Sequence, residues 1–249
     1  MNYELSTQGR THVLEFPVFN MDLDKLDLTR KTLINTINQY SYIVTKQDKA
    51  FKKALMESDV LLPDGVGIVL ASQLLNGEKI KKIAGADLHK YLLEKLNTEG
   101  GKCFYLGSSE NTLKKIQEQV QKDYPSVIVE TYSPPYKPEF DEADNQKMIE
   151  AVNKFNPDVL FVGMTAPKQE KWAHANKEKL NAKTICSIGA VFDFYAGTVN
   201  RPNQFWINMG LEWFIRLLNE PKRMWKRYLY YGPMFAYELV NKKFQRLQA

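Results

Sequence analysis

One carboxylate, Asp64, is the strongest candidate for chemistry in this sequence. It follows an apolar run at residues 60–62 and stands between a proline and two glycines. The apolar run predicts a buried strand, which the proline is expected to end because it lacks an N–H group. Ligands of open α/β sheets bind at the carboxyl ends of the strands, so Asp64 is expected to serve as a general base. The alternative is that Asp64 only caps the helix predicted at residues 66–75.

Neutral polar residues stand at two other predicted strand ends. Thr36 and Asn38 close the strand predicted at residues 32–37, and Gln169 begins a helix shortly after the strand at residues 158–162. Side chains in such places can bind a ligand, or they can satisfy nearby backbone groups or simply belong to the first helical turn. From their position alone, both possibilities stay open for Thr36, Asn38 and Gln169.

Glycines begin the loops at two further strand ends. Gly107 opens a Gly-Ser-Ser loop before a predicted helix, and Gly163 opens the loop that leads to Gln169. Free N–H groups and the helix dipole can attract an anion at the Gly-Ser-Ser loop, although a plain helix cap is the alternative there. One general base beside neutral groups and helix N-termini fits a reaction that releases a phosphate group.

The elements that would position these residues alternate in a regular order. Strand, glycine-containing loop and helix follow one another along the chain, which predicts an α/β fold: a Rossmann-like, mostly parallel sheet with helices on both faces. The loops around Thr36, Asp64, Gly107 and Gly163 should then gather at one edge of the sheet. Residues 12–19 are expected to form an edge strand interrupted by proline, and residues 40–57 a helix broken near Asp48.

Composition excludes several classes of protein. The 249 residues are 44% hydrophobic and 25% charged, as in ordinary globular proteins, and no apolar run approaches the roughly 18 residues of a membrane span. No secretory signal is visible in the first ten residues. The two cysteines and three histidines show no metal-ligand spacing, so we expect no metal site and no cofactor. A complete G-x-G-x-x-G, a Walker loop and a nucleophile elbow are all missing.

The last 49 residues differ from the rest in charge and aromatic content. They hold nine Lys or Arg against three Glu, and 11 of the 30 aromatic residues. We therefore place a boundary near residue 200, with a catalytic domain at 1–200 and a C-terminal helical appendage at 201–249. Arg216, Glu220, Arg223 and Arg227 would share one helical face if a second helix begins at Pro221. A basic and aromatic surface suits either a membrane interface or a nucleic acid, and the many interleaved aliphatic residues favour the membrane.

Several spaced motifs together resemble the WecG/TagA/CpsF glycosyltransferases, over about residues 30 to 230. The resemblance rests on Thr36-x-Asn38, Leu62-Pro63-Asp64-Gly65-Val66-Gly67, Ala84-Gly85-Ala86-Asp87-Leu88, Gly163-Met164-x-x-Pro167-Lys168-Gln169-Glu170-x-Trp172, Gly189-Ala190-Val191-Phe192-Asp193, Arg201-Pro202, Leu211-Glu212-Trp213, Arg216-Leu217 and Glu220-Pro221-x-Arg223.

This resemblance implies an inverting, metal-independent enzyme with Asp64 as general base. It implies transfer of a hexose or N-acetylhexosamine, with N-acetylmannosamine favoured, from a UDP-sugar to an undecaprenyl-diphosphate-linked sugar in bacterial cell-surface polysaccharide or teichoic acid synthesis. Lys82 stands where the family has an arginine. The expected substrate-binding residues are Thr36, Asn38, Lys82, Gly107, Gly163, Gln169, Arg216 and Arg223.

The resemblance also implies partners and a location. The expected partners are the UDP-sugar, the lipid-linked acceptor and the membrane surface, which the appendage would bind; no nucleic acid is expected, and a homo-oligomer is possible. The enzyme would then work in the cytoplasm, peripherally on the inner face of the cell membrane. The alternative is an α/β protein that binds a nucleotide or a nucleic acid without catalysis.

Overall fold

A computed structural model describes residues 9–200, 202–203, 205–206 and 209–248, and the side chains of Arg223 and Leu247 are outside the description. Its centre is a six-stranded sheet in the order β4-β3-β8-β7-β5-β6, in which every pair of neighbours is parallel. This confirms the predicted α/β class. The strands are β3 (Thr32–Ile37), β4 (Val60–Pro63), β5 (Lys102–Gly107), β6 (Ile128–Tyr132), β7 (Val159–Gly163) and β8 (Thr184–Ser187).

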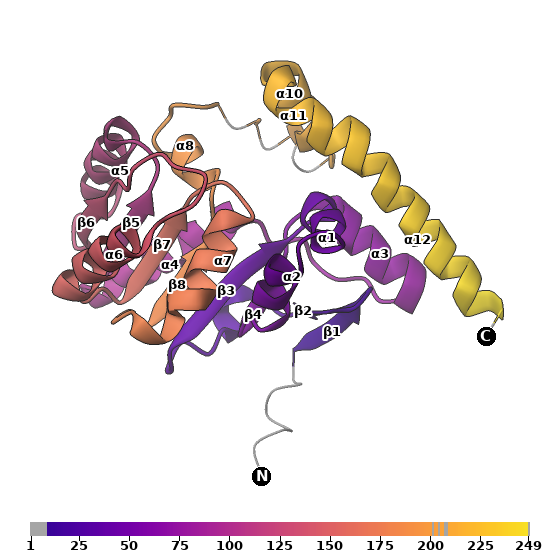
Figure 1. The fold of residues 1–249 in the computed structure, drawn as a ribbon, viewed down its shortest axis with the longest axis horizontal. Helices are drawn as coiled ribbons and strands as arrows, with labels where there is room; N and C mark the ends of the chain where they lie inside the picture. The colour runs from indigo at the N-terminus through magenta and orange to yellow at the C-terminus, as the bar shows by residue number, and fades with distance from the viewer. Residues whose placement is uncertain (1–8, 201, 204, 207–208, 249) are drawn as a thin grey trace, which may run out of the picture.

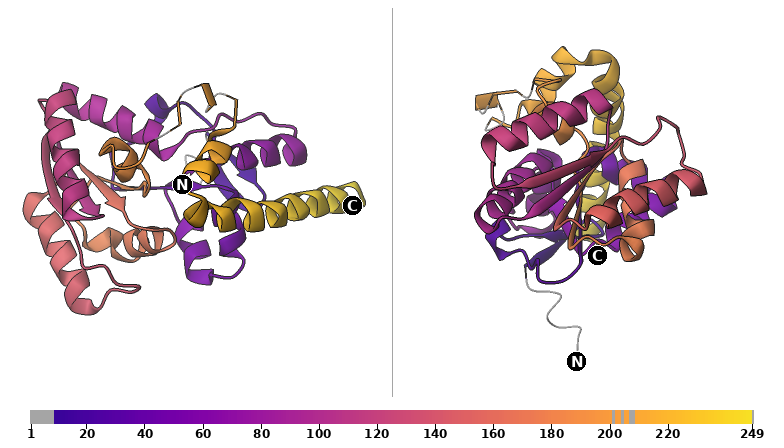
Figure 2. Two further views of the ribbon diagram at one scale, coloured as in Figure 1. Left: turned by 90° about the horizontal axis from the view of Figure 1, so that it is seen from above. Right: turned by 90° about the vertical axis from the view of Figure 1, so that its left-hand side faces the viewer.

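Helices cover both faces of this sheet because successive strand residues point to opposite sides (Figure 2). In β5, Cys103 and Tyr105 face one hydrophobic cluster, whereas Phe104 and Leu106 face another. The first cluster includes α4 (Gly85–Glu99), α5 (Glu110–Asp123) and α8 (Val191–Tyr195); the second includes α6 (Glu142–Phe155) and α7 (Lys168–Asn176), with the 3-10 turn η2 (Lys177–Lys179) following α7.

A third hydrophobic cluster lies beside the β4 edge of the sheet. It joins α1 (Gln39–Thr45), α2 (Lys49–Met56) and α3 (Val66–Asn76) to a small separate sheet. The break predicted near Asp48 is confirmed, because the Asp48 side chain accepts a hydrogen bond from the N–H of Phe51 at 2.8 Å and so caps α2.

The expectation of one edge strand at residues 12–19 is wrong. This segment forms a hairpin of two antiparallel strands, β1 (Arg10–Val13) and β2 (Phe16–Phe19), which is a separate sheet. The chain reverses at Leu14, which has a left-handed φ of 61°. The 3-10 turn η1 (Leu23–Lys25) then leads toward β3.

The C-terminal segment is helical and packs against the first 200 residues (Figure 1). It contains α10 (Glu212–Asn219), α11 (Pro221–Trp225), the π-helical turn η3 (Lys226–Tyr230) and α12 (Tyr231–Gln248). A second helix does begin at Pro221, which is the condition for Arg216, Glu220, Arg223 and Arg227 to share one helical face.

Helix α12 packs against α1 and α3. Phe235 is buried and meets the ring of Tyr42 edge to face at 5.6 Å. A side chain on Gly67 would come within 3.3 Å of the Phe235 ring, so the glycine allows α12 to approach α3 closely. Near its end, Arg246 donates to the carbonyl of Leu75 at 2.6 Å. The segment therefore shares a hydrophobic cluster with the body of the protein. Across the described part of the chain, no helix has the length and apolar character required to cross a bilayer.

Candidate active site

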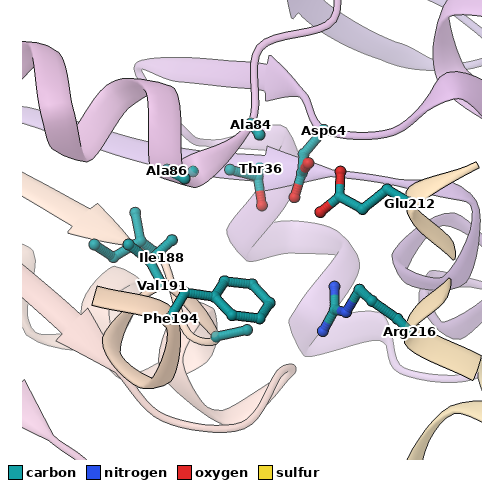
Figure 3. A pocket seen from close by; sticks show the side chains of 11 residues that line it. Thr36, Asp64, Ala84, Ala86, Ile188, Val191, Phe194, Glu212 and Arg216 are labelled. Atoms are coloured by element: carbon teal, nitrogen blue, oxygen red, sulfur yellow. The ribbon is translucent and has the colours of Figure 1, made fainter. Parts of the chain in front are cut away.

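A pocket lies at the carboxyl ends of β3 and β4, where the C-terminal segment approaches the sheet. The sheet side contributes Thr36 and Asp64, and the C-terminal segment contributes Glu212 and Arg216 (Figure 3). The remaining lining residues come from the start of α4 and the region of α8: Ala84, Gly85, Ala86, Ile188, Ala190, Val191 and Phe194. Two residues that were predicted to act together, Thr36 and Asp64, are thus brought side by side by parallel strand pairing.

The backbone holds Asp64 rigidly at its strand end. Its N–H donates to the carbonyl of Ile37 at 2.9 Å, and the N–H of Ile83 donates to the carbonyl of Pro63 at 3.0 Å. Helix α3 begins after Gly65, and no side chain caps it by a hydrogen bond. The capping alternative for Asp64 is therefore not realised, and its carboxylate remains directed into the pocket (Figure 3).

Glu212 brings a second carboxylate to the pocket from α10. It forms an ion pair with Lys82, with 3.0 Å between Nζ and Oε2, and both side chains are largely buried. Figure 3 shows the carboxylates of Glu212 and Asp64 directed toward one another. The family motif included Glu212, but nothing in the sequence placed it beside Asp64.

The surroundings raise the proton affinity of Asp64. Burial raises the pKa of its carboxyl above the usual range, and the negative charge of Glu212 raises this pKa further. The positive charges of Lys82, Arg216 and Arg227 oppose that rise. A carboxyl with a raised pKa is a better proton acceptor near neutral pH than an ordinary aspartate.

Arg216 faces the pocket with unused hydrogen-bond donors. Its Nε and Nη2 atoms are buried and have no hydrogen-bond partner among the described residues. Its guanidinium lies 5.1 Å from the centre of the Phe194 ring. Buried donors without partners are costly, and an anion such as a phosphate would satisfy them in the paired geometry that arginine provides.

Arg227, on the π-helical turn η3, adds another cation whose charge acts on Asp64 and on Arg216. It lies 4.5 Å from the centre of the Tyr40 ring on α1, and its charge reaches both Asp64 and Glu170. Sequence reasoning placed Arg227 on the basic face of the C-terminal segment without assigning it to the site. The π-helical turn that orients it has no signal in the sequence.

Asn38 and Gln169 are engaged by neighbouring groups. The Asn38 side chain accepts from the N–H of Ser41 at 3.0 Å and caps α1. The Gln169 side chain is buried, accepts from the N–H of Met164 at 3.1 Å and donates to Glu170 at 2.9 Å. The other carboxylate oxygen of Glu170 has no partner among the described residues, and burial raises the pKa of Glu170 to about 7. Neither Asn38 nor Gln169 lines the pocket.

Gly107 and Gly163 have a packing role in this structure. They pair at the ends of β5 and β7, and a side chain on Gly107 would come within 2.4 Å of the Gly163 carbonyl oxygen. A side chain on Gly163 would collide with the ring of Phe192. Neither glycine lines the pocket, and the backbone of Arg223 lies in α11, so these three substrate-binding assignments stay predictions.

A parallel α/β sheet with a carboxylate and several cations at its strand ends is suited to enzymes that act on phosphorylated substrates. The family described as glycosyl transferase WecG/TagA/CpsF matches residues 11–249, and the chain therefore belongs to this glycosyltransferase family.

Curated relatives align with this chain over most of their length. An N-acetylglucosaminyldiphosphoundecaprenol N-acetyl-beta-D-mannosaminyltransferase of Bacillus subtilis (strain 168) is 31% identical over 197 residues, which cover 79% of this chain and 75% of the relative. The protein of that name from Bacillus spizizenii is 29% identical, with 85% and 80% covered. One from Staphylococcus aureus (strain MRSA252) is 26% identical, with 82% and 76% covered.

Proposed function

We propose that this protein transfers N-acetylmannosamine from a UDP-sugar to N-acetylglucosamine carried on undecaprenyl diphosphate. The names of its relatives supply the acceptor and the sugar. The observation that carries the proposal is the pocket in which Asp64 faces a cluster of cations from both the sheet and the C-terminal segment. From these relatives we infer a role in bacterial cell-surface polysaccharide or teichoic acid synthesis.

The reaction is a single displacement at the anomeric carbon. Asp64 takes the proton from the acceptor hydroxyl as its oxygen forms a bond to that carbon. The bond from the carbon to the β-phosphate oxygen breaks, and its electron pair leaves with UDP. One displacement on an α-linked UDP-sugar gives a β-linked product, and the relatives are named for transfer of a β-linked sugar. For an α-linked donor we therefore propose an inverting mechanism.

The leaving diphosphate is stabilised by the cations around the pocket. Arg216 offers two buried N–H donors without partners, and Lys82 and Arg227 add positive charge. Because these groups supply the charge that a divalent ion provides in other transferases, no metal is required. Among the described residues, no cluster of three or more His, Cys, Asp or Glu could hold one.

The C-terminal segment docks the enzyme on the membrane that carries its acceptor. Large exposed apolar side chains gather on this segment and on the outer face of α3, where they can enter the lipid headgroup region beside the basic residues. These side chains are Val66, Leu70, Leu74, Met209, Phe214, Leu218, Trp225, Leu229, Tyr230, Tyr237, Val240 and Phe244. The enzyme thus works peripherally on the inner face of the cell membrane.

A panel of UDP-sugars with a soluble, short-chain analogue of the lipid acceptor tests this proposal. We expect UDP-N-acetylmannosamine to give the fastest UDP release and a product of the corresponding mass. Binding of UDP without turnover on any donor would instead support the non-catalytic nucleotide-binding alternative. Faster transfer from another UDP-sugar would show that this other sugar is the donor, and the protein would still be a glycosyltransferase.

A further inference from the structure

The ion pair between Lys82 and Glu212 joins two parts of the chain that are 130 residues apart. Lys82 lies in the loop before α4, and Glu212 is the first residue of α10. Their side chains are only 27% and 19% exposed, so the pair is more shielded than an ordinary surface ion pair. A buried carboxylate is costly to place unless it is paired, and here the paired carboxylate also borders the pocket that contains Asp64.

We propose that Glu212 is a positioning residue of the transfer reaction: its carboxylate holds Lys82 beside the pocket and opposes Asp64 with a like charge, which makes Asp64 a stronger base. This rests on the proposed function of Asp64. Figure 3 shows the two carboxylates next to each other, Asp64 from the sheet side and Glu212 from the C-terminal segment. Two carboxylates that share a confined site ionise less readily together than apart.

One carboxylate and three cations act on the charge of Asp64. Glu212 is the acidic group, Lys82 comes from the sheet side, and Arg216 and Arg227 come from the C-terminal segment. Tyr228, on η3, also interacts with Asp64; a tyrosine is neutral near pH 7, and burial raises the pKa of Tyr228 further. The three cations favour ionised Asp64, so Glu212 is the one charge among them that favours its protonation. Removing this charge must shift the titration of Asp64 toward lower pH.

The pH profile of kcat/KM for donor and acceptor analogue measures this effect. The acid limb reports ionisation of the base in the free enzyme. We expect Glu212→Gln to move this limb about one pH unit lower, whereas Glu212→Asp, which keeps the charge, should retain the wild-type limb. Glu238→Gln is the matched control, because Glu238 lies on α12 and pairs with Lys46 outside the pocket.

A titration that needs no turnover complements the kinetics. In protein labelled with [4-13C]-aspartate, the Asp64 carboxyl resonance is assigned by its loss in Asp64→Asn and followed against pH. Its midpoint should fall in Glu212→Gln and rise in Lys82→Met, which removes a cation that favours ionised Asp64. If Glu212→Gln does not fold, the shift of the Asp64 midpoint in Lys82→Met still tests whether the Lys82–Glu212 pair acts on Asp64.

The inference is overturned if the Asp64 midpoint is unchanged or higher in Glu212→Gln, or unchanged in Lys82→Met. These outcomes are separate from failure of the proposed function. A wild-type protein that transfers no sugar would refute the function, whereas the carboxyl titration requires no substrate and reports only on the charges around Asp64.

Discussion

The ammonium group of Lys82 lies 3.0 Å from the carboxylate of Glu212, so the basic loop before α4 is joined to the first turn of α10 in the C-terminal segment. Glu212 lines the pocket together with Asp64 and Arg216. The pocket is therefore formed by the sheet and the C-terminal segment together, and its charges come from both.

Lys82 and its neighbour Lys81 should differ sharply in their effect on donor use. Lys82→Ala removes a charge beside the pocket and should lower kcat/KM for the UDP-sugar by about 10- to 100-fold, the range for losing a charged hydrogen bond. Lys81→Ala is the matched control, because Lys81 pairs with Asp22 on the exposed surface. Steady-state kinetics on both variants make the comparison. Normal activity in Lys82→Ala with a loss in Lys81→Ala would reverse the assignment.

Transfer should continue when divalent ions are removed. Arg216, Lys82 and Arg227 already place positive charge around the pocket that would receive the diphosphate. We expect the rate of UDP release in excess EDTA to stay within about twofold of the untreated rate. EDTA does not remove the side-chain cations that stabilise the leaving diphosphate. A complete loss that Mg²⁺ or Mn²⁺ restores would show that the cations of the chain are insufficient.

Exposed apolar residues of the C-terminal segment should determine binding to membranes. Deleting the segment would also uncover the hydrophobic cluster around Phe235, so surface substitutions are a cleaner test. Trp225→Ser with Leu229→Ser, at residues 51% and 59% exposed, should weaken binding to anionic liposomes about tenfold or more.

Sedimentation with anionic liposomes at low salt measures this binding. The matched control is Ile128→Ser with Tyr136→Ser, two exposed residues on and after β6, at the far end of the sheet from α12 (Figure 1). Equal loss in both double variants would show that the C-terminal segment has no special role. Unchanged binding in Trp225→Ser/Leu229→Ser would contradict the proposed docking surface.

Stability should fall in acid because of His89 in the core. Its ring nitrogen lies 2.7 Å from the Tyr105 hydroxyl, and burial lowers the pKa of His89 to about 3. Between the unfolded pKa of about 6.5 and pH 3, the unfolded chain binds a proton that the folded protein does not. The free energy of unfolding should therefore decrease as pH falls, by several kcal/mol in total.

Chemical denaturation at a series of pH values tests the role of His89. His89→Gln cannot titrate and should show a flatter pH dependence between pH 6.5 and 4 than the wild type. His12→Gln is the control, because His12 is exposed on β1. If the two variants lose stability with the same slope as the wild type, His89 is not the group that links folding to pH.

The sheet was predictable because most of its elements have a signal in the residues that form them. Most strands of the parallel sheet are short apolar runs followed by a glycine or polar loop, and the helices before and after Asp48 each have their own helical signal. The hairpin before the sheet was not predictable. The chain reverses at Leu14, and leucine rarely adopts a left-handed φ.

The sheet side of the pocket was predictable and the other side was not. Thr36 lies near the end of β3 and Asp64 follows β4, so the parallel pairing of these neighbouring strands brings them together. Glu212 comes from the C-terminal segment, which packs on α1 and α3 through contacts such as Phe235 with Tyr42, and it pairs with Lys82. Such long-range packing is not encoded in any local period, and the packing roles of Gly107 and Gly163 depend in the same way on neighbouring strands.

The most direct test of the central claim is transfer of N-acetylmannosamine by the wild type and Asp64→Asn, followed as product mass with UDP-N-acetylmannosamine and the lipid-acceptor analogue. Asparagine keeps the shape of the side chain and cannot accept the proton, so kcat should fall about 100-fold or more, with donor affinity by calorimetry little changed. Near-normal turnover in Asp64→Asn would contradict the role of Asp64 as the base.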